Sequence, residues 1–434
     1  MRRSATPVPI VRNCGDASPI LCTIARRGGV PLSHKPPTIL QIIPELDTGG
    51  AELSAVEIAE ALARAGARAL VATQGGRLAS RVQAAGAEII PFPAATKNPS
   101  RMLANVRGLE RLIREHNVDL LHARSRAPAW SALGAARRAR VQFVTTYHGA
   151  YSENGRLKNL YNSVMARSDI VIANSGFTAD LVRKRYGTPE ARIRIIHRGV
   201  DCDHFDPAAV PDDRAAALRA LWGIAPSARI VLVPARLTAW KGQRIVLDAA
   251  GILKAQGVQD DVCFVMAGDA QGRNDYLAAL RARAEELGLT DRTFFVGHVA
   301  DMATAYRTAW ATVIASIEPE AFGRVAIETQ AMAVPVIATD LGAPPETILA
   351  RPSVATDQIT GWLVPPGDST LLAERLAAAL AMSPSDHAAM GRRARAHVLG
   401  HFTLRAMKEQ TLATYDHLLG TDLCSRFMSA SAVT

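Results

Sequence analysis

The sequence predicts an α/β protein made of two doubly wound domains that face each other. Apolar, strand-like runs alternate with amphipathic segments over most of the 434 residues, a pattern typical of βαβ units and parallel sheets. Near residue 200 the alternation stops in a stretch rich in Asp and Pro, and then it begins again. The length also favours two or three domains over one.

Six strand-like runs precede this interruption. The first, at 38–44, is followed by AELSAVEIAEALARAG, whose apolar residues fall at helical spacing and whose last residue, Gly66, ends the expected helix. We assign residues 1–36 to a disordered tail or an overlong translation start, and residues 37–200 to the first domain. The other strands are expected at 67–74, 87–93, 118–123, 142–148 and 168–175.

Residues 198–213, RGVDCDHFDPAAVPDD, are expected to link this domain to a second one at 201–400. A helical region is expected from about His387 to Leu419, and the helix in 401–434 is expected to pack back toward the first domain, with a frayed end. Ligands of such sheets bind at the carboxyl ends of strands, so the site is expected in the cleft between the domains. The second domain's strands are predicted at 228–236, 261–268, 292–298, 311–316 and 334–340.

Composition and charge narrow the range of functions. Hydrophobic residues make up 48% and charged residues 21%, as in a soluble globular enzyme. The aromatic content of 5% gives little support to nucleic-acid binding through stacked bases. The net charge of +10 favours anionic partners. Residues 101–140 hold nine Arg against three acids, which fits a membrane surface as well as it fits ordinary solvated helices.

The cysteines and the hydropathy indicate where the protein works. Its five cysteines are scattered and form no CxxC pair, so neither a disulfide framework nor a zinc site is indicated. No apolar run reaches the roughly 18 residues of a membrane span, and the run at 19–24 is too short for a signal peptide. We expect a cytoplasmic protein that associates peripherally with the inner face of a membrane.

Two turns between a strand and a helix carry residues suited to phosphate. In the first domain, Gly49 and Gly50 stand where the backbone can approach a ligand at a helix N-terminus, although a plain turn explains them equally well. In the second domain, Arg236 ends a strand and Lys241 precedes the next helix. Two cations at this place suit a diphosphate; ordinary surface cations are the alternative.

The stretch EPEAFGRVAIETQA, residues 318–331, holds two glutamates. Glu320 is expected in a loop and Glu328 inside a helix that begins near Gly323. Six helical residues at ~1.5 Å each separate Phe322 from Glu328, about 9 Å, which fits the reach across a sugar diphosphate. One carboxylate can then bind sugar hydroxyls and the other a ribose diol, while the helix N-terminus binds phosphate. A capping glutamate and a helix-face glutamate are the alternative.

At this motif the sequence resembles the family-4 retaining glycosyltransferases, which have the GT-B fold. EAFGRVAIE is similar to their two-glutamate motif, and GGAE, HG, RGVD and R…KG precede it in the family's order. The resemblance covers residues 38–418. Each motif is weak alone, but five in order are strong. The resemblance implies a nucleotide-sugar donor bound mainly by the second domain and an acceptor bound mainly by the first.

The resemblance also implies roles for single residues. Arg236 and Lys241 match the pair on the donor diphosphate, and Gly50 matches the glycine beside the phosphates. Glu320 matches the acid that contacts the donor sugar, and Glu328 matches the ribose ligand.

The remaining candidates lie at one turn and at two strand ends. Phe322 and Gly323 match the turn around sugar and phosphate, and Arg324 is grouped with these donor-binding residues. His148 matches a cleft histidine near the reacting sugar and is the second predicted catalytic residue, although a lone histidine is more often structural. His298 is expected near the nucleotide base, mainly through its backbone.

Several positions depart from the family's pattern. Ala321 follows the first glutamate where many relatives have Pro or Gly, and Thr329 and Gln330 follow the second where Ala is usual. These departures put the sugar specificity in doubt. Relatives often have Asn at the position of Arg198.

Three basic residues at the end of the fourth strand and directly after it are candidates for an anionic acceptor, with core or solvated roles as the alternative: His122, Arg124 and Arg126. The triplet DCD at 201–203 mimics an Asp-x-Asp metal site but lies in the linker. We expect no metal and no other cofactor, because Arg236, Lys241 and a helix N-terminus can supply the positive charge.

The predicted function is transfer of a hexosyl unit, with retention of configuration, to a cell-envelope glycan such as lipopolysaccharide or a lipid-linked glycan. Synthesis of a small soluble glycoside and non-catalytic binding of a nucleotide sugar are the alternatives. A dinucleotide-dependent oxidoreductase would need GxGxxG with an acid about 20 residues on, and neither βα turn has it. The nucleotide base, the sugar, the linkage and the oligomeric state are not defined by the sequence.

Overall fold

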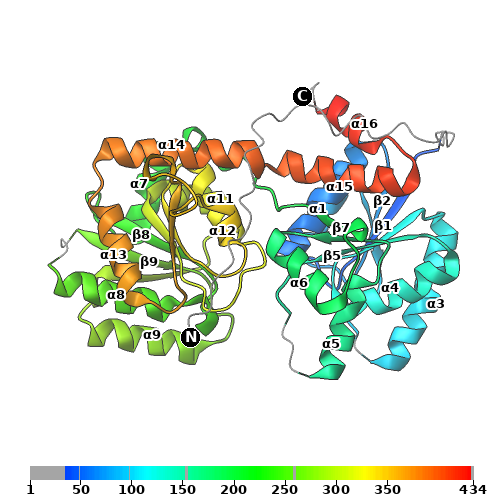
Figure 1. Ribbon diagram of the computed structural model, residues 1–434, viewed down its shortest axis with the longest axis horizontal. Coiled ribbons are helices and arrows are strands. Elements are labelled where there is room, and N and C mark those ends of the chain that lie inside the picture. Colours follow the sequence, from blue (N-terminus) through cyan, green and yellow to red (C-terminus); the bar gives the residue numbers. More distant parts are fainter. Residues whose placement is uncertain (1–34, 48, 97, 152–154, 258–260, 432–434) are drawn as a thin grey trace, which may run out of the picture.

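The computed structural model describes residues 35–431 except residues 48, 97, 152–154 and 258–260. It confirms the two-domain α/β architecture, with the domains side by side and each built around one parallel sheet (Figure 1). The predicted N-terminal tail lies outside the described residues, apart from Lys35 and Pro36. Within the described residues, no helix combines the length and the apolar character needed to cross a lipid bilayer.

The first domain contains a seven-stranded sheet in the order β3-β2-β1-β4-β5-β6-β7. Helices cover both faces, so the central strands are buried throughout, as expected for a parallel sheet. The strands are β1 (Thr38–Ile42), β2 (Arg68–Thr73), β3 (Glu88–Pro91), β4 (Leu120–Ala123), β5 (Gln142–Tyr147), β6 (Ile170–Ala173) and β7 (Ile193–Ile195). The helices are α1 (Gly50–Arg64), α2 (Ala79–Ala84), α3 (Pro99–His116), α4 (Arg126–Ala139), α5 (Arg156–Asn162) and α6 (Gly176–Tyr186).

The second domain contains a six-stranded sheet in the order β10-β9-β8-β11-β12-β13. Its strands are β8 (Arg229–Pro234), β9 (Val262–Ala267), β10 (Thr293–Gly297), β11 (Ala309–Ile314), β12 (Val336–Thr339) and β13 (Gly361–Val364). Its helices are α7 (Asp212–Leu221), α8 (Gln243–Ala255), α9 (Asn274–Glu286), α10 (Met302–Thr308), α11 (Arg324–Ala331), α12 (Pro344–Thr347), α13 (Ser369–Leu380) and α14 (Pro384–His401).

Two strands were missed by the sequence analysis. The three-residue β7 and the four-residue β13 lie at the far ends of their sheets, and each pairs with one neighbour only. Strands this short carry too few residues for an alternating or continuous apolar pattern to stand out.

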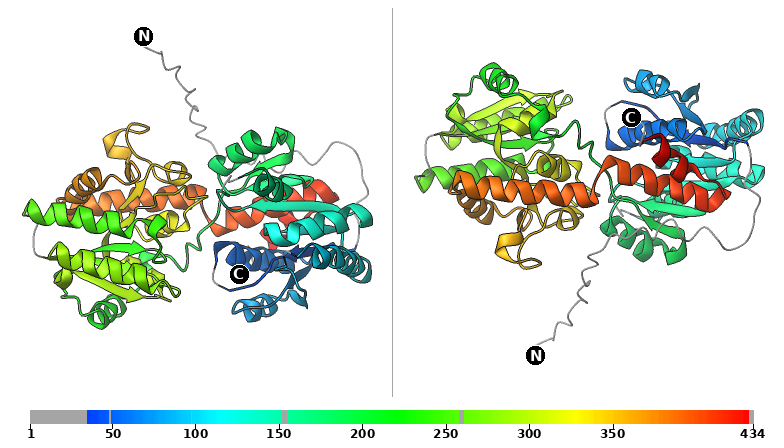
Figure 2. Two further views of the ribbon diagram at one scale, coloured as in Figure 1. Left: turned by 90° about the horizontal axis from the view of Figure 1, so that it is seen from below. Right: turned by 90° about the horizontal axis from the view of Figure 1, so that it is seen from above.

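The C-terminal chain crosses from one domain to the other. The helix α14 packs on α11 of the second domain, and α15 (Leu404–Leu419) runs on from it across the first domain (Figure 2). Phe402 and Thr403 separate the two helices. Thr403 caps α15, because its side chain accepts a hydrogen bond from the amide of Ala406 at 3.1 Å. Tyr415 on α15 is fully buried in the first domain's core.

The expectation of a frayed C-terminal end was wrong for most of that segment. Residues Leu423–Ala430 form a further helix, α16, which packs on α1. Leu423 and Phe427, four residues apart on one helix face, are buried in the first domain's core. The helix is held to α15 by Asp416, whose carboxylate accepts hydrogen bonds from the amides of Leu423 at 2.7 Å and Cys424 at 2.9 Å.

Candidate active site between the domains

The sheet topology marks one place in each domain for a ligand. In an open parallel sheet, ligands bind beyond the carboxyl ends of the strands where the chain reverses its direction of growth. In the second domain the reversal lies between β8 and β11, and in the first between β1 and β4. The segments after β8 and β11 carry Arg236, Lys241 and Glu320, which the sequence analysis had selected.

Lys241 and Glu320, 79 residues apart, form a direct ion pair at this place. Both side chains are largely buried, and the hydroxyl of Ser316 donates a 2.7 Å hydrogen bond to the same carboxylate oxygen, Oε1. The Lys241 ammonium also lies 4.2 Å from the centre of the Trp240 ring. The pair therefore has one defined geometry, with the positive charge fixed at the carboxyl end of β11.

A glycine allows this approach of the two segments. Gly242 follows Lys241 with φ of 72°, a left-handed conformation that favours glycine. A Cβ at this position would lie 1.8 Å from the carbonyl oxygen of Ala315, which is impossible without moving the backbone. The β8–α8 turn can reach β11 only because residue 242 has no side chain.

Arg236 differs from Lys241 because its side chain is exposed. Its carbonyl oxygen accepts a 2.9 Å hydrogen bond from the side chain of Gln243, which fixes the backbone of the turn. Among the residues that the structure describes, none forms an ion pair with its guanidinium. A free cation next to a fixed one suits the two charges of a diphosphate.

The loop that carries Glu320 is held by both domains. In the second domain, the Glu320 carbonyl oxygen accepts a 2.9 Å hydrogen bond from the amide of Ala343. From the first domain, the Ser175 hydroxyl donates a 2.6 Å hydrogen bond to the carbonyl oxygen of Ala321. The position of the loop therefore depends on how the two domains are docked.

A second contact between the domains was not anticipated. Glu346, on α12 of the second domain, accepts hydrogen bonds at 2.7 Å from the amides of Gly176 and Phe177 at the start of α6 in the first domain. His197 lies 3.2 Å from the same carboxylate. These contacts lower the pKa of Glu346 against the opposing effect of burial. A carboxylate at a helix N-terminus is recognisable in sequence only when it lies on the same helix.

The helix that follows Glu320 begins as predicted, with Gly323 as its N-cap residue at φ of 78°. Glu328 lies within it and accepts a 3.0 Å hydrogen bond from the Tyr306 hydroxyl. Burial raises the pKa of Glu328, and the guanidinium of Arg324, 3.8 Å away, partly offsets this rise. The two glutamates therefore have different partners: Glu320 forms an ion pair with Lys241, and Glu328 accepts a hydrogen bond from the Tyr306 hydroxyl.

Two of the predicted donor-binding side chains are engaged elsewhere. Arg324 donates to the Glu57 carboxylate at 2.9 Å and to the Gly199 carbonyl oxygen at 3.0 Å, so it joins α11 to α1 of the first domain. The Phe322 side chain is 3% exposed and packs in an apolar cluster with Phe402. Phe322 can therefore contribute to a donor site only through its backbone.

His298 lies at the end of β10, with β9 between this strand and β8. It is exposed and lines a hollow of about 1050 Å³ on the outer edge of the domain together with Leu221 and Trp222. The structure does not bring its side chain into contact with Lys241 or Glu320.

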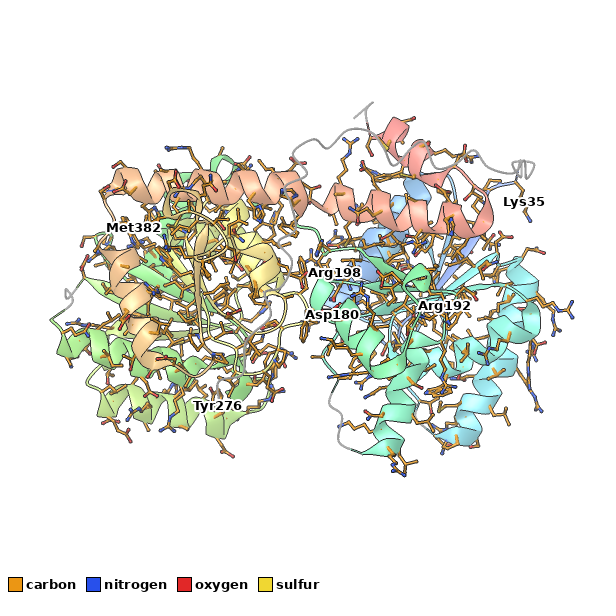
Figure 3. The ribbon with its side chains drawn as sticks, viewed as in Figure 1. Lys35, Asp180, Arg192, Arg198, Tyr276 and Met382 are labelled. Atoms are coloured by element: carbon orange, nitrogen blue, oxygen red, sulfur yellow. The ribbon has the colours of Figure 1, made fainter. Side chains whose placement is uncertain are left out.

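His148 lies at the end of β5 and contacts Arg198, which Figure 3 places on the side of the first domain that faces the second. A guanidinium has no acceptor, so Nδ1 of His148 must accept and the ring proton must sit on Nε2. Nε2 is shielded from solvent and has no partner among the described residues. Sequence reasoning had noted Arg198 only as a departure from the family; the structure gives it this orienting contact.

The other basic candidates of the first domain are held within it. Arg124 is 2% exposed, and its Nε donates to the Gln41 side chain at 2.8 Å. His122 is fully buried between the Tyr415 hydroxyl at 2.6 Å and the Thr146 hydroxyl at 2.7 Å. These two residues are placed in the core rather than at a surface open to an acceptor.

Arg126, the first residue of α4, is partly exposed. It stacks over the Tyr151 ring at 4.0 Å, and its Nη1 donates to Asn162 at 2.8 Å. Gly50 begins α1, and a Cβ there would meet no protein atom within 4 Å, so its surroundings leave room for a ligand.

The two buried histidines predict how stability depends on pH. Burial first, and then Arg198 and Arg124, lower the pKa of His148 well below 6.5; burial also lowers that of His122. Below about pH 6.5 the unfolded chain binds protons that the folded chain does not, so stability is full above this pH and falls as the pH falls. The limiting slope is about 1.4 kcal/mol per pH unit for each histidine.

Urea denaturation between about pH 7.5 and about pH 5.5 would measure this dependence. The slope of the free energy of unfolding against pH should be shallower in His148→Gln than in the wild type. His122 and the partly buried His387 and His397 contribute to this slope in both proteins. Equal slopes in the two proteins would show that folding does not lower the pKa of His148.

The DCD triplet forms a turn. Asp201 accepts hydrogen bonds from the amides of Asp203 and His204, both at 3.2 Å, as a side chain in an Asx turn does. In the described part of the chain, no three His, Cys, Asp or Glu side chains gather so as to hold a metal ion.

Each of the two domains matches a known protein family. Residues 48–204 match the family described as Glycosyltransferase Family 4, and residues 216–397 match Glycosyl transferases group 1. A D-inositol 3-phosphate glycosyltransferase of Segniliparus rotundus is 32% identical over 280 residues. That match covers 64% of this chain and 58% of the relative.

Two solved structures extend the comparison. A glycosyltransferase from Rickettsia africae is 31% identical, with a TM-score of 0.81 over 90% of this chain and 100% of the other. HepE of Anabaena in complex with UDP-glucose is 26% identical, with a TM-score of 0.75 over 88% of this chain and all of the other.

Proposed function

Since this chain belongs to the group 1, family-4 glycosyltransferases with the GT-B fold, we propose that it moves a hexosyl unit from a nucleoside-diphosphate sugar to an acceptor hydroxyl with retention of anomeric configuration. The observation that carries the proposal is the Lys241–Glu320 ion pair at the reversal point of the second sheet, beside the exposed Arg236. A diphosphate placed there meets two cations and the N-terminus of α11.

In the proposed reaction the bond between the anomeric carbon and the diphosphate oxygen breaks as the acceptor oxygen attacks from the same face. The acceptor's proton passes to the departing diphosphate. Lys241 and Arg236 stabilise the negative charge that develops on the leaving group, and the enzyme would need no divalent metal for this. The Nε2–H of His148, oriented by Arg198, has no hydrogen-bond partner among the described residues, and a sugar hydroxyl would reach this shielded atom only after the side chains around it move.

For the donor, uridine diphosphate sugars are the first to test, because HepE binds UDP-glucose at 26% identity to this chain. For the acceptor, we propose a membrane-borne glycan of the cell envelope, on the ground of the basic first domain. The curated relatives named D-inositol 3-phosphate glycosyltransferases supply a second candidate, a phosphorylated polyol.

Titration calorimetry with UDP, GDP and ADP tests the donor site directly. One nucleotide should bind in a single-site isotherm, and Arg236→Gln should weaken its binding by about 10- to 100-fold, the value of a charge-assisted hydrogen bond. The matched control is Arg307→Gln, which removes an exposed arginine of α10 ahead of β11, at the opposite edge of the sheet. Equal affinities of the wild type and Arg236→Gln for the nucleotide would show that the diphosphate does not bind beside Arg236.

A further inference from the structure

The outer surface of the first domain carries an apolar groove of about 470 Å³ between α3, α4 and α5. Trp130 and Tyr161 lie in it, and three leucines at its rim are exposed: Leu103 by 54%, Leu157 by 83% and Leu160 by 52%. These are three of the eight large apolar side chains that are exposed in the described residues. Such a gathering marks an interaction surface, whereas single exposed leucines do not.

The helix geometry directs these leucines to one side. Leu157 and Leu160 are three residues apart on α5 and therefore share a helix face, and Leu103 of α3 lines the same groove. Trp130 closes the groove from α4, with its indole Nε1 donating to the Tyr161 carbonyl oxygen at 3.1 Å. The polar atom of the indole is therefore satisfied inside, and the groove surface that remains to be covered is mainly apolar.

In the described part of the chain, the exposed charges next to these leucines are positive. Residues 156–167, which include α5, contain three cations and no acid. Exposed cations border the leucines without an acidic partner in the part of the chain that the structure describes: Arg101, Arg107, Arg156 and Lys158. The acid nearest in the sequence of α3, Glu110, is already occupied by Arg114 and Arg138.

Cations around exposed leucines are complementary to an anionic lipid surface. The leucines can enter the boundary between headgroups and acyl chains, while the arginines and lysine keep their charges at the phosphates. Each such cation strengthens binding to an anionic leaflet about fivefold.

Figure 1 shows α3 and α5 on the lower side of the first domain, opposite α15 and α16. The surface is also close to the candidate site along the chain. Only seven residues lie between His148 and Arg156, the first residue of α5. An acceptor held in the membrane under α5 would therefore approach the site from its first-domain side.

We propose that Leu103, Leu157 and Leu160, with the cations around them, dock this protein on the surface of an anionic lipid bilayer. The purpose of the docking rests on the proposed membrane-borne acceptor, but the docking itself is testable without any catalysis. Association with vesicles should be strong at low salt and weaken at high salt, because the cations are exposed and are screened by salt.

Sedimentation with vesicles of mixed phosphatidylcholine and phosphatidylglycerol, and of phosphatidylcholine alone, tests the proposal. The wild type should bind the mixed vesicles, and the triple variant L103S/L157S/L160S and the variant R156E/K158E should each bind them at least about tenfold more weakly. The matched control is L221S/L399S, which removes leucines of the second domain that are 80% and 46% exposed. It should bind as the wild type does.

Several outcomes would overturn the proposal. They are absence of binding by the wild type, equal binding by wild type and triple variant, and an equal loss in the control. Concentration-dependent dimerisation in light scattering that disappears in the triple variant would assign the groove to a second copy of the chain.

Unchanged nucleotide binding by the triple variant would show that it is folded. It would also distinguish the two possible failures. A failure of the proposed function would appear as absence of nucleotide binding or turnover in every variant, whereas a failure of docking would not.

Discussion

Glu320→Gln should lower kcat by about 10²- to 10³-fold while KM for the donor changes by no more than about threefold. The amide is nearly the same size and can still accept the hydrogen bond from Ser316. It lacks the negative charge that holds Lys241 at the carboxyl end of β11, so this cation is no longer placed where charge develops on the leaving diphosphate. Such an interaction is made mainly in the transition state and affects kcat more than binding.

Two further variants test whether the loss of kcat is specific to Glu320. Glu318→Gln changes an exposed carboxylate in the same loop, two residues away, and should leave kcat and KM unchanged. Glu328→Gln should raise KM for the donor more than it lowers kcat, because the implied role of Glu328 is to bind the ribose. If Glu320→Gln and Glu328→Gln changed donor affinity equally and left kcat alone, the roles given to the two glutamates would be wrong.

Lys241→Met should abolish most of the activity and also lower the free energy of unfolding, by about 2 kcal/mol. The variant leaves the Glu320 carboxylate in place with only the Ser316 hydroxyl as a side-chain partner. Removing one partner of a fully buried ion pair costs ~3–5 kcal/mol, and here the cost is smaller because both side chains keep some contact with solvent.

The double variant Lys241→Met/Glu320→Gln separates the loss of activity in Lys241→Met from its loss of stability. It should recover part of the lost stability, because no unpaired charge remains, and it should stay inactive. Lys408→Met is the control: Lys408 forms a part-buried pair with Glu60, 3.2 Å away between α15 and α1, and Glu60 keeps Arg81 at 3.1 Å as a second partner. It should change stability without changing turnover. Full activity in Lys241→Met would remove this lysine from the catalytic site.

The GT-B fold and the family could be predicted from sequence because the apolar strand patterns and the short motifs that follow them are local and recur along the chain. Continuous apolar runs such as β8 and β9 define buried parallel strands, and such strands bring the residues after them to one edge of a sheet. That reasoning was enough to place Arg236, Lys241 and Glu320 in one region, and the comparisons confirmed the family and the fold.

The partners of the site residues could not be predicted in the same way. Arg324 is 267 residues from Glu57 in the sequence, and His148 is 50 residues from Arg198. Which atoms meet depends on rotamers and on the docking of the two domains, and neither is encoded in a local pattern. Arg324 therefore looked like a donor ligand, although the structure uses it to join α11 to α1.

The C-terminal segment shows a second limit of sequence reasoning. The small and polar residues of CSRFMSASAVT suggested a frayed end. Two apolar residues at helical spacing, Leu423 and Phe427, nevertheless fix α16 on the first domain's core. Tertiary packing of a narrow apolar face decides the outcome for so short a helix, and intrinsic propensity does not.

We propose that this chain transfers a sugar from a nucleoside diphosphate at the Lys241–Glu320 site. The most direct test is to measure nucleoside diphosphate release from UDP-, GDP- and ADP-sugars, with and without EDTA. Crude membrane glycolipid and D-inositol 3-phosphate serve as acceptors, and Glu320→Gln and Glu318→Gln are run in parallel. We expect release from one class of donor that is stimulated by an acceptor, unaffected by EDTA, retained in Glu318→Gln and lost in Glu320→Gln. Equal release by the wild type and Glu320→Gln, or none from any donor by a folded wild type that binds no nucleotide, would contradict this proposal.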